Sequence, residues 1–442
     1  MRVTTYLVAL ACCLALVPET AAGGGLNVDP PGFSNVPFTF EPPGARSLGM
    51  GGTFIGLADD ATASEANPAG LTILTRPEVS IHVRNATFDV EALDVNANII
   101  DDSFGPAFPD PSFSTISVFD ESVTSASFGS FVYPIKQRWV LSAYWQQATN
   151  FEGDDTNTLN LLPGDSISST RRLEATLGNF GVSAGFKVNE WFSVGASLRA
   201  SRLTLETFDQ LDAQLTNGGA GAINFDTIVD DDDTQFTYNV GVMFRPGEMV
   251  SVGVVYKQGG DFDIEGVDNC ASSAPQSCDI VAGDSTSDPF FVQIEVPDFL
   301  GAGVAIRPLD QLTLVADIDF ITYSDIAAEV DDFDLAFCDF DFDGIVDEPD
   351  CAANPVETVD DEIEVHVGAE YVFFVGENST PLSLRAGVFS DPDHDNTKEI
   401  DSDQVHASLG IGVVIKEDFQ LDFAVRAADT ITDAVFSFVY RF

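Results

Sequence analysis

A chain of 442 residues has room for two or three ordinary domains or for one large barrel. Its 71 acidic side chains outnumber 19 basic ones, and the net charge of −52 excludes a nucleic-acid-binding surface, which needs a basic footprint. A hydrophobic fraction of 45%, with 36 phenylalanines, excludes a disordered chain and indicates that apolar and acidic residues are kept apart in space.

The N-terminus is typical of a secretory signal peptide over residues 1–22. Arg2 supplies the positive start, Tyr6 to Val17 form the apolar run, and Thr20-Ala21-Ala22 provides a small-residue cleavage site. The run is too short to span a bilayer as a helix, and no later stretch reaches the ~18 apolar residues that a membrane helix needs. A membrane location would therefore require a barrel of strands.

The next stretch, residues 44–74, reads as neither a strand nor a helix. Gly49, Gly51 and Gly52 make it too flexible for a regular element, and residues 64–66 are too short for a stable helix in water. The stretch is nevertheless small and apolar between its polar points, so we expect it to be packed. We predict that the rest of the chain is a cylinder of strands closed around it.

From residue 78 onward, apolar and polar residues alternate in one segment after another. In residues 192–200, for example, the apolar side chains fall on one face of a strand and the small or polar ones on the other. We count about 14 such strands. They lie near 78–88, 122–134, 138–150, 171–188, 191–205, 234–246, 249–259, 294–307, 310–323, 361–375, 381–390, 404–416, 418–428 and 432–442.

The connections between these strands alternate between short turns and long loops. The long ones are residues 89–121, 151–170, 206–233, 260–293, 324–360 and 391–403. They hold more than half of the acidic residues, so we expect an acidic rim that binds divalent cations or that only keeps the protein soluble in salt. A soluble sandwich has no reason to sort its loops by length, whereas outer-membrane barrels do. We therefore predict an all-β fold, a transmembrane antiparallel β-barrel over residues 78–442.

The last strand supports this interpretation. Phe436, Phe438, Tyr440 and Phe442 share one face, as in the aromatic girdle of a barrel at the membrane boundary. A chain that ends on Phe442 also resembles the C-terminal signature of bacterial outer-membrane barrels. That resemblance implies contact with the barrel-assembly machinery and with outer-membrane lipid.

Three stretches carry a more specific resemblance: R-S-L-G-M-G-G at 46–52, A-D-D-A-T-A at 58–63, and residues 299–323. With them, the chain resembles the FadL/OmpP1/TodX family of outer-membrane transporters for long-chain fatty acids and other hydrophobic molecules. The resemblance implies that residues 23–77 are a plug, or hatch, in the barrel lumen, and that a hydrophobic ligand crosses passively. Related barrels that serve protein secretion share part of the pattern. A plugged barrel that is a partner or scaffold in secretion or surface attachment is therefore the alternative, and a general porin is a third reading.

The turn Asn67-Pro68-Ala69 belongs to the same resemblance. Asn67 tolerates turn geometry, and Pro68 has a fixed φ. We expect this motif to hold the plug in the lumen and to let it shift when ligand arrives. An ordinary turn is the alternative.

A second motif, D-x-D-x-D-G-x-x-D-x-x-D, occupies residues 339–350. Its spacing of oxygen ligands and its glycine fit a calcium loop of EF-hand type, although the last position is an Asp instead of the usual Glu. A merely acidic loop is the alternative, and no other cofactor is expected. The candidate ligands are Asp339, Asp341, Asp343, the carbonyl of Ile345, Asp347 and Asp350.

Four cysteines remain after removal of the signal peptide, and they form two pairs that are close in sequence. In an exported protein, the pairs Cys270–Cys278 and Cys338–Cys351 predict two loop disulfides.

Alternation also places a set of basic side chains inside the barrel: Arg84, Arg199, Arg385 and Arg426. One of them is a candidate partner for a substrate carboxylate. The alternative is that they pair with acids of the lumen, such as Asp317, Asp319 and Asp422, or of the plug, Asp59 and Asp60. His82, His366 and His406 point inward on the same reading. The sequence contains no nucleophile elbow, phosphate loop or zinc motif, so we do not expect an enzyme.

Overall fold

The computed structural model describes part of the chain, and within that part no helix has the length and apolar character needed to cross a membrane. Residues 1–39, with the expected signal peptide, lie outside it. The described residues are 40–94, 115–136, 138–160, 166–215, 221–272, 287–326, 329–331, 361–377, 379–391, 404–428 and 431–442.

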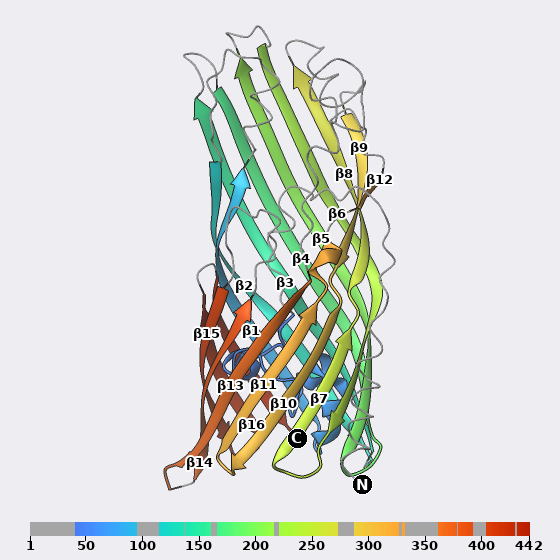
Figure 1. Cartoon of the computed structure of the whole chain (residues 1–442), viewed down its shortest axis with the longest axis vertical. Helices are drawn as coiled ribbons and strands as arrows, with labels where there is room; N and C mark the ends of the chain where they lie inside the picture. The colour runs from blue at the N-terminus through green and yellow to red at the C-terminus, as the bar shows by residue number, and fades with distance from the viewer. Residues whose placement is uncertain are drawn as a thin grey trace.

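The described residues contain seventeen strands, which form one antiparallel sheet, drawn as the tall tube of Figure 1. In chain order they are β1 (Glu78–Asp94), β2 (Thr115–Ile135), β3 (Trp139–Asn160), β4 (Ser166–Lys187), β5 (Phe192–Leu215), β6 (Gly221–Phe244), β7 (Val250–Lys257), β8 (Gly260–Ser272), β9 (Ser287–Val296), β10 (Phe299–Leu309), β11 (Leu312–Ile321), β12 (Glu329–Asp331), β13 (Glu362–Val375), β14 (Thr380–Asp391), β15 (Gln404–Ile415), β16 (Phe419–Ala427) and β17 (Ile431–Arg441).

Fourteen of these strands, all but β8, β9 and β12, close into a barrel. The first strand pairs with the last, from Glu78 opposite Arg441 to Phe88 opposite Ile431. Strand β7 pairs with β6 on one side and with β10 on the other, so the wall bypasses β8 and β9. The predicted closed antiparallel barrel of about 14 strands is therefore confirmed.

The wall is apolar outside and polar inside, as the period of two predicts. On β16, Phe419, Phe423 and Val425 are exposed on the outer face, while Asp422 and Arg426 are buried on the inner one. A soluble protein would bury the first set and expose the second. This inversion is what a barrel surrounded by lipid requires.

Aromatic side chains gather at the end of the barrel that carries the short turns. The ring of Trp139 lies 4.5 Å from that of Phe186, and the ring of Phe442 lies 5.6 Å from Tyr440 and 6.4 Å from Phe131. The predicted aromatic face of the last strand is therefore part of a larger cluster. Such a girdle marks the boundary between lipid and water.

The predicted long loops are partly wrong. Residues 151–160, 166–170, 206–215 and 221–233 belong to strands β3, β4, β5 and β6, and β8, β9 and β12 form inside two other expected loops. The long strands β4, β5 and β6 reach far above the closed wall in Figure 1. Outside the membrane the outer face no longer needs to be apolar, so the strands continue there with polar residues on it, held by backbone pairing and by side-chain contacts such as the bond from Arg202 to Asp232.

Residues 40–74, named here the inner segment, lie within the lower part of the barrel in Figure 1. They contain short helical elements that we did not predict from the sequence, namely α2 (Ala45–Leu48), α3 (Ala63–Ala66) and the 3-10 helix η2 (Pro68–Ile73). Turns this short are unstable in water. They persist here because almost every residue from 45 to 71 is buried against the wall.

Candidate functional site

Backbone groups of the inner segment pair with polar side chains that point inward from β17, β15, β11, β4 and β6. These bonds run from Ala45 N to Ser437 Oγ (2.8 Å), Gly51 N to Ser408 Oγ (2.9 Å), Phe54 N and Ile55 N to Asp317 Oδ2 (2.7 and 2.9 Å), Ser183 Oγ to Ser64 O (2.7 Å) and Asn239 Nδ2 to Glu65 O (3.1 Å). Because the partners come from all round the cylinder, the inner segment lies across the lumen.

Glycines in the wall let the inner segment approach the strand backbones. A Cβ at Gly195 of β5 would lie 2.2 Å from the carbonyl carbon of Pro68, and one at Gly253 of β7 would lie 2.2 Å from the carbonyl oxygen of Ile55. Real Cβ atoms do not come that close to backbone atoms. Any side chain at either glycine would therefore push the inner segment off the wall.

The predicted turn motif is one of these contact points. Asn67 is fully buried; its Oδ1 accepts a hydrogen bond from Ala69 N at 3.2 Å. Its Nδ2 donates to Ile55 O at 3.2 Å and to Val242 O of β6 at 3.3 Å. Pro68 begins the turn η2, where its missing N–H costs nothing. The motif thus joins two parts of the inner segment to the wall, while its movement on ligand arrival stays a prediction.

A buried ionic network also ties the inner segment to the wall. Arg46 of α2 contacts Asp59 at 2.5 Å and Glu370 of β13 at 3.0 Å, and Arg385 of β14 contacts Glu370 at 2.8 Å and Asp422 at 2.7 Å. Burial opposes the charge of Arg46, but the surrounding carboxylates, Asp59 first, raise its pKa well above the ordinary value. Sequence reasoning missed Arg46 and Glu370. The only feature of the sequence that could have pointed to Arg46 is its position just before the glycines of residues 49–52.

The four arginines chosen from alternation all lie on the inner side of the wall. Arg84 and Arg426 both contact Asp433, and Arg385 contacts Asp422 as the alternative reading expected. Arg199 of β5 differs from them. Its Nε donates to Thr237 Oγ1 at 3.0 Å and its Nη2 to the carbonyl oxygen of Gln258, so its described partners are neutral. Whether any of them meets a substrate carboxylate stays a prediction.

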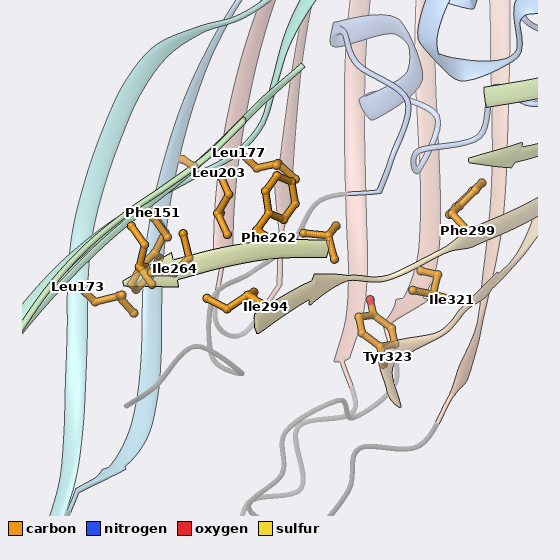
Figure 2. Packing of buried hydrophobic residues seen from close by; sticks show 14 of the residues in the cluster. Phe151, Leu173, Leu177, Leu203, Phe262, Ile264, Ile294, Phe299, Ile321 and Tyr323 are labelled. Atoms are coloured by element: carbon orange, nitrogen blue, oxygen red, sulfur yellow. The ribbon is translucent and has the colours of Figure 1, made fainter. Parts of the chain in front are cut away.

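Above the inner segment the lumen becomes apolar, which is unusual for a barrel interior. Figure 2 shows side chains from neighbouring strands and from β8 and β9 that point toward one another. We name them the apolar cluster. Its labelled members are Phe151, Leu173, Leu177, Leu203, Phe262, Ile264, Ile294, Phe299, Ile321 and Tyr323.

A cavity of about 50 Å³ lies between the apolar cluster and the inner segment. Leu177, Phe262 and Phe299 contribute apolar lining. Arg199 and Lys257 contribute its positively charged side chains. Lys257 is neutralised by Glu65 of α3 at 2.6 Å. The cavity therefore combines an apolar wall with one cation, Arg199, that has no carboxylate among its described contacts.

The wall itself is incomplete beside this region. Among the described residues, β2 and β3 pair only between Phe128–Ile135 and Trp139–Gln146, and above that level β2 pairs with β1 and β3 with β4. The register of β3 shifts at this level, between Gln147 and Thr149. Cavities of about 40 and 10 Å³ lie there, and Ser127 lines both of them.

Several predicted sites fall outside the described residues. These are the whole calcium-type loop 339–350 and the cysteines Cys278, Cys338 and Cys351. Cys270 lies in β8. The calcium site and both disulfides therefore stay predictions.

Comparisons with known proteins agree with this geometry. A search of curated proteins finds no match. A crystal structure of a Pseudomonas aeruginosa FadL homologue has a TM-score of 0.64 at 15% identity, covering 95% of this chain and 99% of that one. The Ralstonia pickettii toluene transporter TbuX has a TM-score of 0.56 at 16% identity, covering 91% of this chain and 99% of that one. The Pseudomonas putida toluene transporter TodX has a TM-score of 0.56 at 16% identity, covering 92% of this chain and 99% of that one. At these identities the likeness shows the barrel fold alone.

The family comparison goes further. The model of the outer membrane protein transport protein family (OMPP1/FadL/TodX) matches residues 45–434. This match covers most of the inner segment and nearly the whole wall. The chain therefore belongs to the OMPP1/FadL/TodX family of outer-membrane transport proteins and is a multi-pass β-barrel of the bacterial outer membrane.

Proposed function

We propose that the protein conducts hydrophobic molecules, such as long-chain fatty acids or aromatic hydrocarbons, passively across the outer membrane. The observation that carries this proposal is the apolar cluster in the lumen. Barrel interiors are ordinarily polar, whereas ten or more buried apolar side chains cluster in this one, and such a lining suits an apolar cargo. Membership of the transport family and similarity to two toluene transporters support the same cargo class.

The inner segment is the plug of this channel. Its contacts with the wall on all sides oppose a permanent water pore, and the Asn67 motif and the Arg46 network are the fixed points that would have to yield before cargo passes along the axis. Because those contacts are buried and numerous, a path that leaves the plug in place is favoured.

The interrupted pairing between β2 and β3 supplies such a path. It lies at the height of the apolar cluster's lower edge, where Gln146 and Ala148 line both the main cavity and one of the two wall cavities. We place the exit of cargo here, sideways into the lipid. A hydrophobic molecule would then not cross the polar lower lumen.

Uptake of radiolabelled oleate and toluene by a deletion strain that carries the gene on a plasmid tests the cargo. Leu203→Gln puts an amide into the apolar cluster, and we expect uptake of both compounds to fall. Thr204→Gln, the next residue on β5, is the control because its side chain faces away from the lumen. Unchanged uptake in Leu203→Gln would overturn the proposal.

The route has its own test. Ser125 lines the wall opening, and Ser125→Trp fills it with a bulky ring. Thr124→Trp, one residue away on the outer face, is the control. Uptake should fall only in the first variant, and equal uptake in both would remove the sideways exit while leaving the cargo class intact.

Three further roles rest on the sequence. We propose that the loop 339–350 binds calcium, that the acidic loops contact outer-membrane lipid through divalent cations, and that the strand ending at Phe442 engages the barrel-assembly machinery. None of these roles involves catalysis, in keeping with a family of transport proteins.

A further inference from the structure

Three side chains able to bind a metal ion meet inside the lumen, where β11 and β13 pair beside the inner segment. Asp319 of β11 lies opposite Glu364 of β13, and His366 follows two residues later on the same face. Each offers one ligand atom, and these atoms lie within 4.8 Å of one another. All three side chains are more than nine-tenths buried.

The hydrogen bond on the far side of the ring fixes the tautomer of His366. Nδ1 lies 2.7 Å from the carbonyl oxygen of Gly51 in the inner segment. A carbonyl oxygen only accepts hydrogen bonds, so Nδ1 carries a proton. Nε2 then faces Glu364 Oε2 at 3.2 Å and Asp319 Oδ2 at 3.4 Å. A backbone carbonyl on one ring nitrogen is the arrangement that orients metal-binding histidines.

Asp319 is the second sign of a missing ligand. Among the described residues no hydrogen bond reaches its carboxylate, and Oδ1 is buried without a partner. The Nε2 atom of His366 lies 3.4 Å from its Oδ2 atom. A buried carboxylate without donors is costly, so it needs either a proton or a positive charge beside it. Glu364, in contrast, accepts a bond from the Tyr323 hydroxyl at 3.0 Å and keeps Oε2 for the site.

The spacing fits a small divalent ion. With metal–ligand distances of roughly 2.0–2.2 Å in a tetrahedral site, neighbouring ligand atoms lie about 3.3–3.6 Å apart. The two distances from His366 Nε2 are 3.2 and 3.4 Å. A second proton on the ring is the competing occupant, but it would supply one positive charge to two carboxylates, whereas a divalent ion supplies two.

We propose that Asp319, Glu364 and His366 form a binding site for a divalent transition-metal ion of the zinc class. One imidazole nitrogen and two carboxylate oxygens are ligands that such ions accept and that calcium and magnesium, which prefer oxygen alone, accept poorly. Through the bond from His366 to Gly51, the ion ties β11 and β13 to the inner segment. The bound ion would thus anchor the inner segment to the wall, and this role does not depend on which cargo the barrel carries.

The test measures zinc bound to the purified barrel in detergent, after chelation and then dialysis against zinc with calcium and magnesium in excess to occupy exposed carboxylates. Asp319→Asn and His366→Gln remove ligands. His406→Gln is the matched control, because His406 packs on the same Phe389 ring as His366, at 4.2 Å against 4.6 Å. Its Nε2 faces one carboxylate, Asp391, instead of two.

We expect one tightly held zinc per barrel in the wild type and in His406→Gln, and at least about tenfold weaker binding in the two ligand variants. Zinc should also raise the melting temperature of the wild type and of His406→Gln, but not that of the two ligand variants. X-ray absorption at the zinc edge of the wild type needs no variant and should show one imidazole ligand. Equal zinc in all four proteins, or a spectrum with oxygen ligands alone, would mean an adventitious ion only and would overturn the proposal.

Discussion

Replacing Arg199 with methionine separates fatty acids from hydrocarbons as cargo. Methionine keeps the apolar stem of the side chain and removes its charge. Arg199 lines the main cavity, and its described contacts, Thr237 Oγ1 and the Gln258 carbonyl, use two of the five N–H groups of a guanidinium. The remaining donors face no described carboxylate, so a bound carboxylate can meet them.

The size of the effect follows from the kind of bond that is lost. A hydrogen bond between charged groups contributes about 1.5–3 kcal/mol. Since 1.4 kcal/mol is a factor of ten in affinity, Arg199→Met should weaken oleate binding about 10- to 100-fold. Toluene has no charged group, so its binding should change by less than about twofold.

Arg202→Met is the control for this experiment. Arg202 lies on the same strand but faces outward, where it is paired with Asp232 at 2.7 Å and more than half exposed. Binding of labelled oleate and toluene to the purified barrel is the assay, with thermal unfolding as a check that both variants are folded. Oleate affinity that is unchanged in Arg199→Met, or that falls as much in Arg202→Met, would refute the role of Arg199.

Four other outcomes follow from the structure. Gly195→Leu should displace the inner segment and raise ion conductance in planar bilayers, whereas Gly178→Leu, with nothing near its Cβ, should not. Asn67→Ala removes three buried hydrogen bonds, so brief conductance openings should become more frequent. Arg385→Met leaves the buried carboxylate of Asp422 without its cation, while Glu370 keeps Arg46, and the free energy of unfolding should fall by about 3–5 kcal/mol in urea titration. Asp343→Asn should abolish calcium binding by the loop 339–350 in calorimetry; undiminished binding would place calcium elsewhere.

The wall could be predicted from the sequence because lipid and lumen impose a strict period of two. That rule ends where the strands leave the membrane. The run Asp230 to Asp233 looks like a loop, yet it lies within β6. Its carboxylates are occupied by neighbouring backbone: Asp233 Oδ2 accepts from Asp263 N at 3.2 Å, and Asp231 Oδ2 accepts from Glu265 N at 2.8 Å. Such partners depend on strand register, which the sequence pattern does not contain.

The same limit applies to the candidate site. Alternation places Arg84 and Arg426 inside the barrel correctly, but it does not reveal that both reach Asp433 from two different strands. It also turns Asp319 and His366 inward without showing that they meet. The period of a strand fixes the face of each side chain, whereas the register between strands decides its neighbours.

The tight backbone contact between wall glycines and the inner segment constrains the order of events during biogenesis. A closed barrel leaves no free space for a segment that contacts strands on every side. Inserting the segment after closure would therefore require strand pairs to separate again. We therefore expect β1 and β17 to pair after the inner segment has taken its place between the strands. In that order of assembly, the inner segment is the core around which the strands of the barrel close.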